Sequence, residues 1–191
     1  MPYIAPPSRP ELDVHIEVIV KLIKDDSNDR FGYLKSLQFV LGKLSKDLLF
    51  SFTNDLKFYW TYKNASFQRY AVHISELKDA IIAQIESEKD REEKLSGLYN
   101  YCCTQIIFLS LSDLRYWTFN QARSACAVVA LKLYETFSDE NELVNILIGV
   151  LLCDIPDESY RRVGVDYEEK KIRENGDVAG YKRWNPDEFY D

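Results

Sequence analysis

The residues best suited to bind a partner lie close to the C-terminal end of the chain. Tyr160, Arg161 and Arg162 stand together, and Tyr167 and Lys170 follow them shortly afterwards. Guanidinium groups bind carboxylates and phosphates through paired hydrogen bonds, and a tyrosine adds a flat ring with a hydroxyl group. We interpret this group as a candidate contact surface for a protein or a ligand. Its full predicted membership is Tyr160, Arg161, Arg162, Tyr167, Lys170, Asn175 and Asp177.

A simpler interpretation of the same stretch is helix capping. The two arginines would end one apolar helix at 162, where the helix dipole favours cations, and Gly164 would let the chain turn. Asp166 would cap a second short helix, and Asn175-Gly176 would stop it. In this interpretation the charged side chains serve folding alone.

Two aromatic pairs form a second candidate, a stacking surface for a base or nucleotide. They lie in two similar segments, 55–65 and 113–122, whose resemblance suggests an internal duplication of a helix-pair unit. The stretch 50–62, which overlaps the first segment, is rich enough in aromatics to pass for a strand, but the duplication makes us prefer helix for both segments. Core packing is the favoured interpretation of the aromatics themselves. The pairs are Tyr59 with Trp60 and Tyr116 with Trp117.

Catalytic motifs have little support. His15 and His73 lie far apart in amphipathic segments, and no phosphate-binding glycine loop or nucleophile motif occurs. One enzyme class remains as an alternative, the all-α nucleotide pyrophosphohydrolases, which hold magnesium with carboxylates from facing helices. Because half of such a motif is missing at the expected spacing, we expect no enzyme and no cofactor. The carboxylates that could serve are Glu88, Glu92, Glu93, Asp139 and Glu142.

The cysteines predict neither zinc nor disulfides. Cys102 and Cys103 are adjacent, Cys126 and Cys153 stand alone, and no Cys-x-x-Cys pair exists. We expect all four to be small buried hydrophobic residues in a reducing compartment.

Length and composition favour one ordinary globular domain. The chain has 191 residues, of which 46% are hydrophobic and 14% aromatic, which is enough for a real core. Its formal net charge of -7 makes general nucleic-acid binding an unfavoured role. No run suits a membrane span and no secretory signal stands at the N-terminus, so we expect a cytoplasmic protein without a membrane partner.

Apolar periodicity predicts an all-α fold, a compact bundle of about six or seven helices. Leu12, Ile16, Ile19 and Ile23 recur at helical spacing, for example, while strand patterns are weak throughout. The expected helices cover 12–23, 31–50, 66–94, 98–111, 114–137, 140–162 and 166–175.

We expect a single helical domain with two different ends. Four prolines in the first ten residues predict an extended arm over 1–10, followed by the domain over 11–178 and a tail over 179–191. Gly97 marks a helix break or a close approach. The core is predicted in three apolar stretches, 98–111, 126–133 and 143–152.

Three separated blocks of the sequence carry a resemblance to a known family. The first is Met1-Pro2-Tyr3-Ile4 with Arg9 and Leu12-Asp13. The second joins Gly97-Leu98 and Asn100-Tyr101 to Ile146 and Ile148-Gly149-Val150-Leu151. The third is Tyr160-Arg161-Arg162, then Tyr167-Glu168-Glu169-Lys170-Lys171 and Glu174-Asn175-Gly176-Asp177-Val178. In this order they resemble a family of small, functionally uncharacterised proteins of tailed bacteriophages and prophages. The resemblance covers about half of the chain, and 25–94 has no counterpart in it.

That resemblance implies a phage-encoded protein acting in the cytoplasm of the infected bacterial host, and it supplies no catalytic residues. Two non-enzymatic roles are compatible with the residues. The favoured one is a protein-interaction factor that binds a host or phage protein, or itself as a homo-oligomer. The alternative is a protein that binds and sequesters a nucleotide signal of host defence, for which the arginines and aromatics would supply the contacts.

Overall fold

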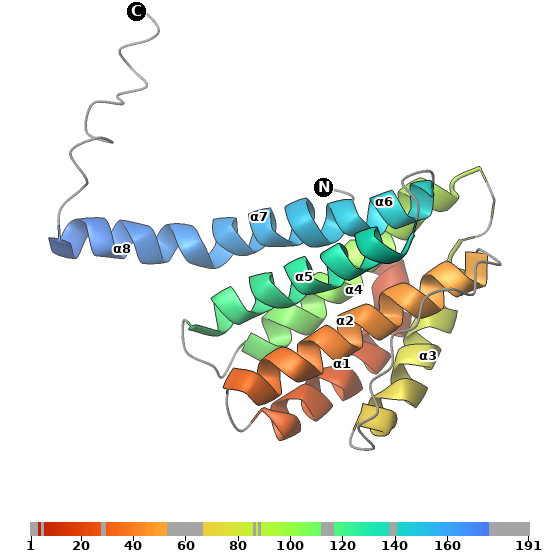
Figure 1. Ribbon diagram of the computed structural model, residues 1–191, viewed down its shortest axis with the longest axis horizontal. Coiled ribbons are helices and arrows are strands. Elements are labelled where there is room, and N and C mark those ends of the chain that lie inside the picture. The colour runs from red at the N-terminus through yellow and green to blue at the C-terminus, as the bar shows by residue number, and fades with distance from the viewer. Residues whose placement is uncertain are drawn as a thin grey trace, which may run out of the picture. The chain divides into compact units, whose positions relative to one another are not determined.

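Helices make up most of the part of the chain that the computed structural model describes (Figure 1). That part comprises residues 4, 6–27, 30–52, 67–85, 87, 89–111, 117–137 and 141–175. No strand occurs among these residues, so the predicted all-α fold is confirmed. Within the same ranges, no helix is both long enough and apolar enough to cross a membrane. The chain divides into two units, residues 1–156 and residues 157–191, called unit 1 and unit 2 below.

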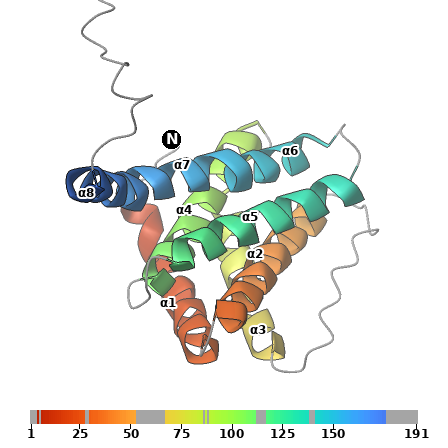
Figure 2. The ribbon, with the colours of Figure 1, turned by 60° about the vertical axis from the view of Figure 1, so that its left-hand side comes forward.

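Unit 1 is a helical bundle in which α2 packs against α1, α3 and α5. Helix α1 also packs against α4, and α2 and α5 run side by side (Figures 1 and 2). A short 3-10 turn precedes α1, and a π-helical segment, η3, follows α6. The elements are η1 (Pro6–Ser8), α1 (Arg9–Asp26), α2 (Arg30–Phe52), α3 (Gln68–Ala83), α4 (Arg91–Leu111), α5 (Trp117–Thr136), α6 (Glu142–Gly149) and η3 (Val150–Asp154).

Helix α1 shows how the sequence pattern produces this packing. Its four periodic residues, Leu12, Ile16, Ile19 and Ile23, are all fully buried. Pro10 stands in the first turn, where the helix needs no amide donor, so the proline does not disturb it. The chain is therefore helical from residue 6 onward, and the prediction that residues 6–10 are extended is wrong.

Polar contacts at both ends of α1 tie it to α3 and fix the antiparallel direction of the pair. At one end Gln84 donates its side-chain amide to the carbonyl oxygen of Ser8, at 3.0 Å. At the other end Tyr70 donates its hydroxyl to Asp26 at 2.7 Å, and Arg69 pairs with the same carboxylate. Because Tyr70 is fully buried, this bond offsets the cost of removing its hydroxyl from water.

Two buried hydroxyl pairs link α2 to α4. The Tyr33 hydroxyl lies 3.2 Å from Ser110 Oγ, and Ser45 Oγ lies 2.6 Å from the Tyr99 hydroxyl. Both tyrosines are fully buried, so each pair satisfies a polar group that would otherwise destabilise the core.

The predicted core is right at its centre and too broad at its edges. Ile107 and Leu147 have no exposed surface. Four apolar residues in the same predicted stretches have exposed fractions between 40% and 56% because they lie on the outer faces of their helices. These four are Leu109, Val128, Leu131 and Leu152.

The predicted helix over 66–94 is wrong at its C-terminal end. The structure ends α3 at Ala83 and begins α4 at Arg91, and Gly97 lies buried within α4 instead of separating two helices. The run of acids and bases over 86–94 consists mainly of good helix formers, so local propensity favours one helix across a region where the chain turns.

Unit 2 corrects the prediction of a turn at Gly164. The helical segments α7 (Ile155–Ser159), η4 (Tyr160–Gly164) and α8 (Val165–Asn175) follow one another without a gap, and η4 is π-helical. Gly164 lies inside η4, and Asp166 lies within α8 instead of capping a new helix before its start. A Cβ atom at Gly164 would lie 2.5 Å from Cδ2 of Tyr160. The glycine therefore permits the close approach of an aromatic ring.

The predicted stacking surface falls largely outside the described residues. Tyr59, Trp60 and Tyr116 lie in undescribed segments, and Trp117 is the first residue of α5, with its side chain outside the description. The stacking surface and the internal duplication stay predictions. Gly176, the expected helix stop, also lies outside the described residues.

Candidate functional site

Unit 2 brings Arg161 and Arg162 together on the carboxylate of Glu158. Arg161 donates from Nε to Oε2 at 2.9 Å and from Nη2 to Oε1 at 2.8 Å, which is a paired, two-point contact. Arg162 donates from its Nε to Oε1 of the same carboxylate. The arrangement follows from helical spacing, because residues three and four positions apart lie on one face. We call these three residues the Glu158 cluster.

Burial is distributed unevenly within the Glu158 cluster. The Glu158 side chain is 5% exposed, whereas those of Arg161 and Arg162 are 59% and 51% exposed. The hydrogen bond from Arg161, with further contributions from Arg162, lowers the pKa of Glu158 to about 2. Glu158 is therefore ionised at any neutral pH and orients two guanidinium groups that remain accessible to solvent.

Sequence reasoning missed Glu158 as a member of the site. The signal was present, because an acid three and four positions before two arginines predicts same-face ion pairs in a helix. Tyr160, Arg161 and Arg162 were interpreted as the end of a helix, however, so the face that the two arginines share with Glu158 was not considered.

Tyr160 is held in place along the same stretch of unit 2. Its ring packs over Gly164, and its hydroxyl donates to Oε2 of Glu168 at 2.5 Å. The side chain remains 41% exposed. Single π-helical turns such as η4 occur frequently at functional sites, where they redirect side chains. The structure therefore places three predicted residues, Tyr160, Arg161 and Arg162, on one π-helical turn.

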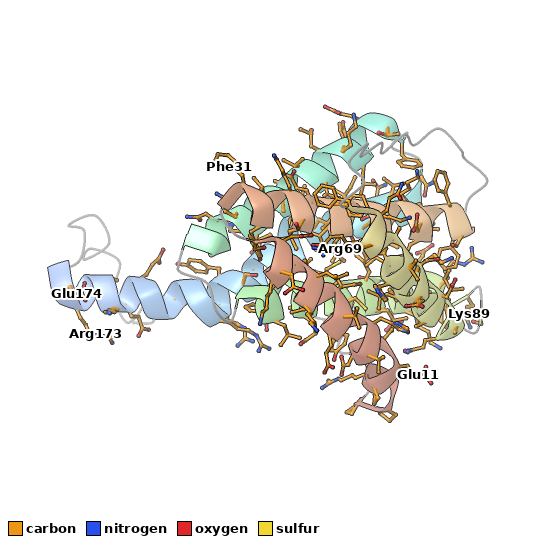
Figure 3. The ribbon with its side chains drawn as sticks, turned by 90° about the horizontal axis from the view of Figure 1, so that it is seen from below. Glu11, Phe31, Arg69, Lys89, Arg173 and Glu174 are labelled. Atoms are coloured by element: carbon orange, nitrogen blue, oxygen red, sulfur yellow. The ribbon has the colours of Figure 1, made fainter. Side chains whose placement is uncertain are left out.

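The remaining predicted members of the site are not drawn into this arrangement. Lys170 is 67% exposed and lies 3.9 Å from Glu174, an ion pair of small energetic value. Arg173 and Glu174 also lie on α8 (Figure 3). Tyr167 and Asn175 belong to α8, but their side chains are outside the description, and Asp177 is outside it altogether.

A second cluster, in unit 1, joins residues from two of the separated sequence blocks. Tyr101 of α4 donates its hydroxyl to Asp13 of α1 at 2.7 Å, and the Arg9 guanidinium lies 5.7 Å from the centre of the Tyr101 ring. Arg9 also donates to the carbonyl oxygen of Ile4 at 3.2 Å. Burial, followed by the bond to Asp13, raises the pKa of Tyr101. This Tyr101 cluster fastens the start of the chain to α4.

The two histidines, which are far apart in the sequence, meet at one carboxylate. His15 Nδ1 and His73 Nδ1 lie 3.6 Å and 3.1 Å from Oε2 of Glu76, across the α1–α3 contact. Sequence reasoning treated each histidine separately and did not predict the contact. Among the described residues, no group of three or more His, Cys, Asp or Glu side chains is arranged to hold a metal ion.

Two of the carboxylates considered for magnesium do approach each other. A hydrogen bond with Glu142 and its negative charge raise the pKa of Glu92, so the start of α4 lies beside the start of α6. Glu93 is exposed on α4, while Glu88 and Asp139 lie outside the described residues. The described pair alone supplies too few ligands for a magnesium site.

The cysteines divide into three buried residues and one exposed residue. Burial raises the pKa of Cys102 and Cys103, and raises that of Cys126 to about 12. Buried thiols of this kind are inert. Cys153 is exposed in η3, so the prediction that all four are buried is wrong at this position. It lies one residue beyond Leu152, which also faces outward from η3.

Comparison with known proteins identifies the chain at the level of a family. Neither the curated proteins nor the solved structures contain a match to the chain. A family model described as Domain of unknown function (DUF6899) matches residues 1–178. This range takes in all of the helices described above, and it includes 25–94, which had no counterpart in the resemblance drawn from the sequence. The chain therefore belongs to the DUF6899 family.

Proposed function

We propose that this protein is a non-enzymatic protein-interaction factor whose binding surface includes Tyr160, Arg161 and Arg162. The observation that supports this proposal best is the Glu158 cluster. A buried carboxylate holds two guanidinium groups in place while both side chains stay more than half exposed.

Arginine and tyrosine are, with tryptophan, the residue types enriched among the residues that contribute most to binding at protein interfaces. Their usual drawback is flexibility, because binding must immobilise long side chains at a cost of about 0.5–1.5 kcal/mol each. The two-point contact of Arg161 with Glu158, and the packing of Tyr160 over Gly164, meet part of that cost before any partner arrives. The partner surface best matched to them offers carboxylate or carbonyl oxygens.

The same geometry makes a nucleotide ligand the less favoured alternative. A phosphate group requires several cations with uncompensated charge. Glu158 neutralises part of the charge of both arginines, and the other basic residues with described side chains in α8, Lys170 and Arg173, lie near Glu174 and Glu169. A protein surface accepts such half-neutralised guanidinium groups more readily than a phosphate does.

The resemblance to proteins of tailed phages supports a location for this activity. We propose that the partner is a host or phage protein in the cytoplasm of an infected bacterium. Binding through the arginines does not depend on where the protein acts, so the binding surface and the proposed location can be tested separately.

The test compares Arg162→Ala with Arg173→Ala. Both changes remove an arginine of unit 2 that pairs with a glutamate, but only Arg162 belongs to the Glu158 cluster. A protein retained from bacterial lysate by the parent chain should be purified, and its affinity for each variant should be measured by calorimetry. We expect Arg162→Ala to weaken binding about tenfold or more and Arg173→Ala to leave it within about twofold. Tyr167→Ala tests the predicted residue whose side chain lies outside the description.

Equal affinity of the parent, Arg162→Ala and Tyr167→Ala would contradict the proposed surface. Native mass spectrometry of the purified protein supplies the second arm. A nucleotide that is retained by the native protein and released on denaturation would favour the sequestration role over the protein-interaction role.

A further inference from the structure

The side chain of Tyr160 runs along its helix toward the C-terminal end. Its ring lies against Gly164, four residues later, and its hydroxyl donates to Oε2 of Glu168, eight residues later, at 2.5 Å. Side chains in helices usually lean the other way, toward the N-terminus and over the preceding turn. The forward direction of Tyr160 therefore requires space on the following turn and a polar partner beyond it. Gly164 provides the space, and Glu168 provides the partner.

The contact between Tyr160 and Glu168 depends on the π-helical turn between them. In an α-helix, residues eight positions apart are separated by about 80° around the helix axis. A π turn closes its hydrogen bonds over five residues instead of four, so it takes up one extra residue. That extra residue brings positions 160 and 168 to within about 20° of each other around the axis. The π turn is formed in η4, where the Val165 amide donates to the carbonyl oxygen of Tyr160.

Gly164 determines whether the Tyr160 ring can lie in this position. The three atoms nearest to a Cβ placed on Gly164 all belong to that ring, at 2.5, 3.0 and 3.2 Å. A larger residue would displace the ring, and with it the hydroxyl that reaches Glu168. Gly149 directly precedes the other π-helical segment, η3, but a Cβ placed there has no neighbour within 4 Å among the described residues. Of these two glycines, only Gly164 accommodates an aromatic ring.

We propose that Tyr160, Gly164 and Glu168 form a latch that holds η4 in the π-helical register, in which an amide bonds five residues back. π turns are rare, which indicates that the α-helical register is normally the more stable one. The contact with Glu168 favours the π register because that register brings the two side chains into line. The latch also holds the tyrosine ring on the turn that carries Arg161 and Arg162, and its value for binding rests on the function proposed above. Gly164 and Glu168 are thus positioning residues that act through Tyr160.

Two matched glycine variants of the full chain test the latch. Neither glycine has the left-handed backbone conformation that would itself strain an alanine. Scalar couplings across hydrogen bonds, measured by NMR, identify the carbonyl group to which the Val165 amide is bonded. We expect Tyr160 to be that partner in the parent and in Gly149→Ala. In Gly164→Ala the ring is displaced, so we expect the partner to change to Arg161, four residues back, as in an α-helix.

Variants of the acceptor test the far end of the latch. Glu168→Ala removes the group that accepts the Tyr160 hydroxyl, so it should weaken the coupling between Val165 and Tyr160. Glu168→Gln keeps a side-chain oxygen that can accept the same hydrogen bond, and it should keep the coupling. The control is Glu169→Ala, because Glu169 pairs with Arg173 and should leave the coupling unchanged. Glu168 is exposed, so these substitutions should not prevent folding.

Two results would overturn the latch. The first is a Gly164→Ala variant in which the Val165 amide is still bonded to the carbonyl oxygen of Tyr160 at the parent strength. The second is an equal change of this coupling in Glu168→Ala and Glu169→Ala, because the hydroxyl contact would then have no specific effect on the register. The glutamate variants decide the question even if Gly164→Ala does not fold.

Affinity for the purified partner protein tests whether the latch serves the binding surface. Gly164→Ala should raise the dissociation constant about tenfold, because the ring is no longer held in place before binding, and Gly149→Ala should stay within about twofold of the parent. A Gly164→Ala variant that loses the π register and binds as the parent does would overturn this inference, while a loss of affinity in Arg162→Ala would still support the proposed function. Unchanged binding by Arg162→Ala would instead overturn the proposed function, and the NMR couplings would still decide whether the latch exists.

Discussion

Two clusters in this protein combine arginine, tyrosine and carboxylate side chains. In one cluster an arginine nitrogen is shielded from solvent, and in the other the carboxylate is shielded. Around Tyr101, the ring lies under the Arg9 guanidinium, and Arg9 Nε is buried without a hydrogen-bond partner among the described residues. Around Glu158, the carboxylate is enclosed and the guanidinium groups face solvent. Residue type is nearly the same in both clusters, so burial decides what each one can do.

The comparison teaches which losses should affect stability and which should affect binding. A polar group that is enclosed leaves an unsatisfied partner behind when its contact is removed, and that cost falls on folding. A polar group that faces water loses little in the free protein when a contact is removed. We therefore expect the Tyr101 cluster to hold the fold together and the Glu158 cluster to be available to a partner.

The largest expected effect is on folding, and it should differ between the buried and the exposed side of α4. Ile107→Asp buries an unpaired charge in the core, because Ile107 has no exposed surface, and it should prevent recovery of folded protein. Leu109→Asp, two residues further along α4 at a position that is 40% exposed, should be recovered with a circular dichroism spectrum like that of the parent. If both variants fold equally well, burial in the core of unit 1 has been misjudged.

A smaller effect should distinguish the two tyrosine hydroxyls. Tyr101→Phe removes a hydroxyl bonded to Asp13 and should lower the free energy of unfolding by about 1–2 kcal/mol, since Asp13 loses a partner in a half-buried setting. Tyr160→Phe removes the matching bond to Glu168 from a ring that is 41% exposed, and should cost less than about 0.5 kcal/mol. Urea unfolding of both variants measures the difference. Equal losses would remove the distinction drawn between the clusters.

The smallest effect concerns the pH dependence of unit 2. The pKa of Glu158 is lowered to about 2 from an ordinary value of 4.5, so its ion pairs contribute fully above pH 4.5. That contribution should fade as the pH drops from 4.5 toward 2, and solvent screening of the arginines limits it to about 1 kcal/mol. Hydrogen-exchange protection factors for residues 158–164 should therefore fall over this range in the parent. They should change less in Glu158→Gln, which has no carboxylate to protonate there, and identical profiles would contradict the assignment.

The sequence predicted the fold well for helices whose apolar residues lie on a single face. In α1 the apolar residues recur at helical spacing, and all four predicted positions are buried. In α5 the same kind of pattern was misleading, because apolar residues occupy both faces and a periodicity argument assigns them all to the core. The exposed Leu131 is the result.

The position of the candidate site was predicted from the sequence, but the contacts that hold its side chains were not. Tyr160, Arg161 and Arg162 were recognised from their chemistry, whereas Gly164 was interpreted as a turn. A glycine can permit either a turn or a close contact. At Gly164 the close contact with the Tyr160 ring, which only the structure shows, identifies the second role. The spacing of Glu158 before the two arginines predicts ion pairs on one helix face, but the low exposure of its side chain is not recorded in the local sequence.

The hydroxyl pairs between α2 and α4 also determine which alignment of these helices is allowed. Tyr33 and Ser45 are twelve residues apart in α2, and their partners Ser110 and Tyr99 are eleven residues apart in α4. Apolar side chains alone would tolerate a slip of one helix along the other by a turn, since leucine packs acceptably in several places. Such a slip would take the Tyr33 and Tyr99 hydroxyls away from their partners, and both of these tyrosines are buried. The two serines would keep their bonds to backbone carbonyl oxygens within their own helices. The two hydroxyl pairs therefore favour one alignment of α2 with α4 over the other alignments that apolar packing alone would accept.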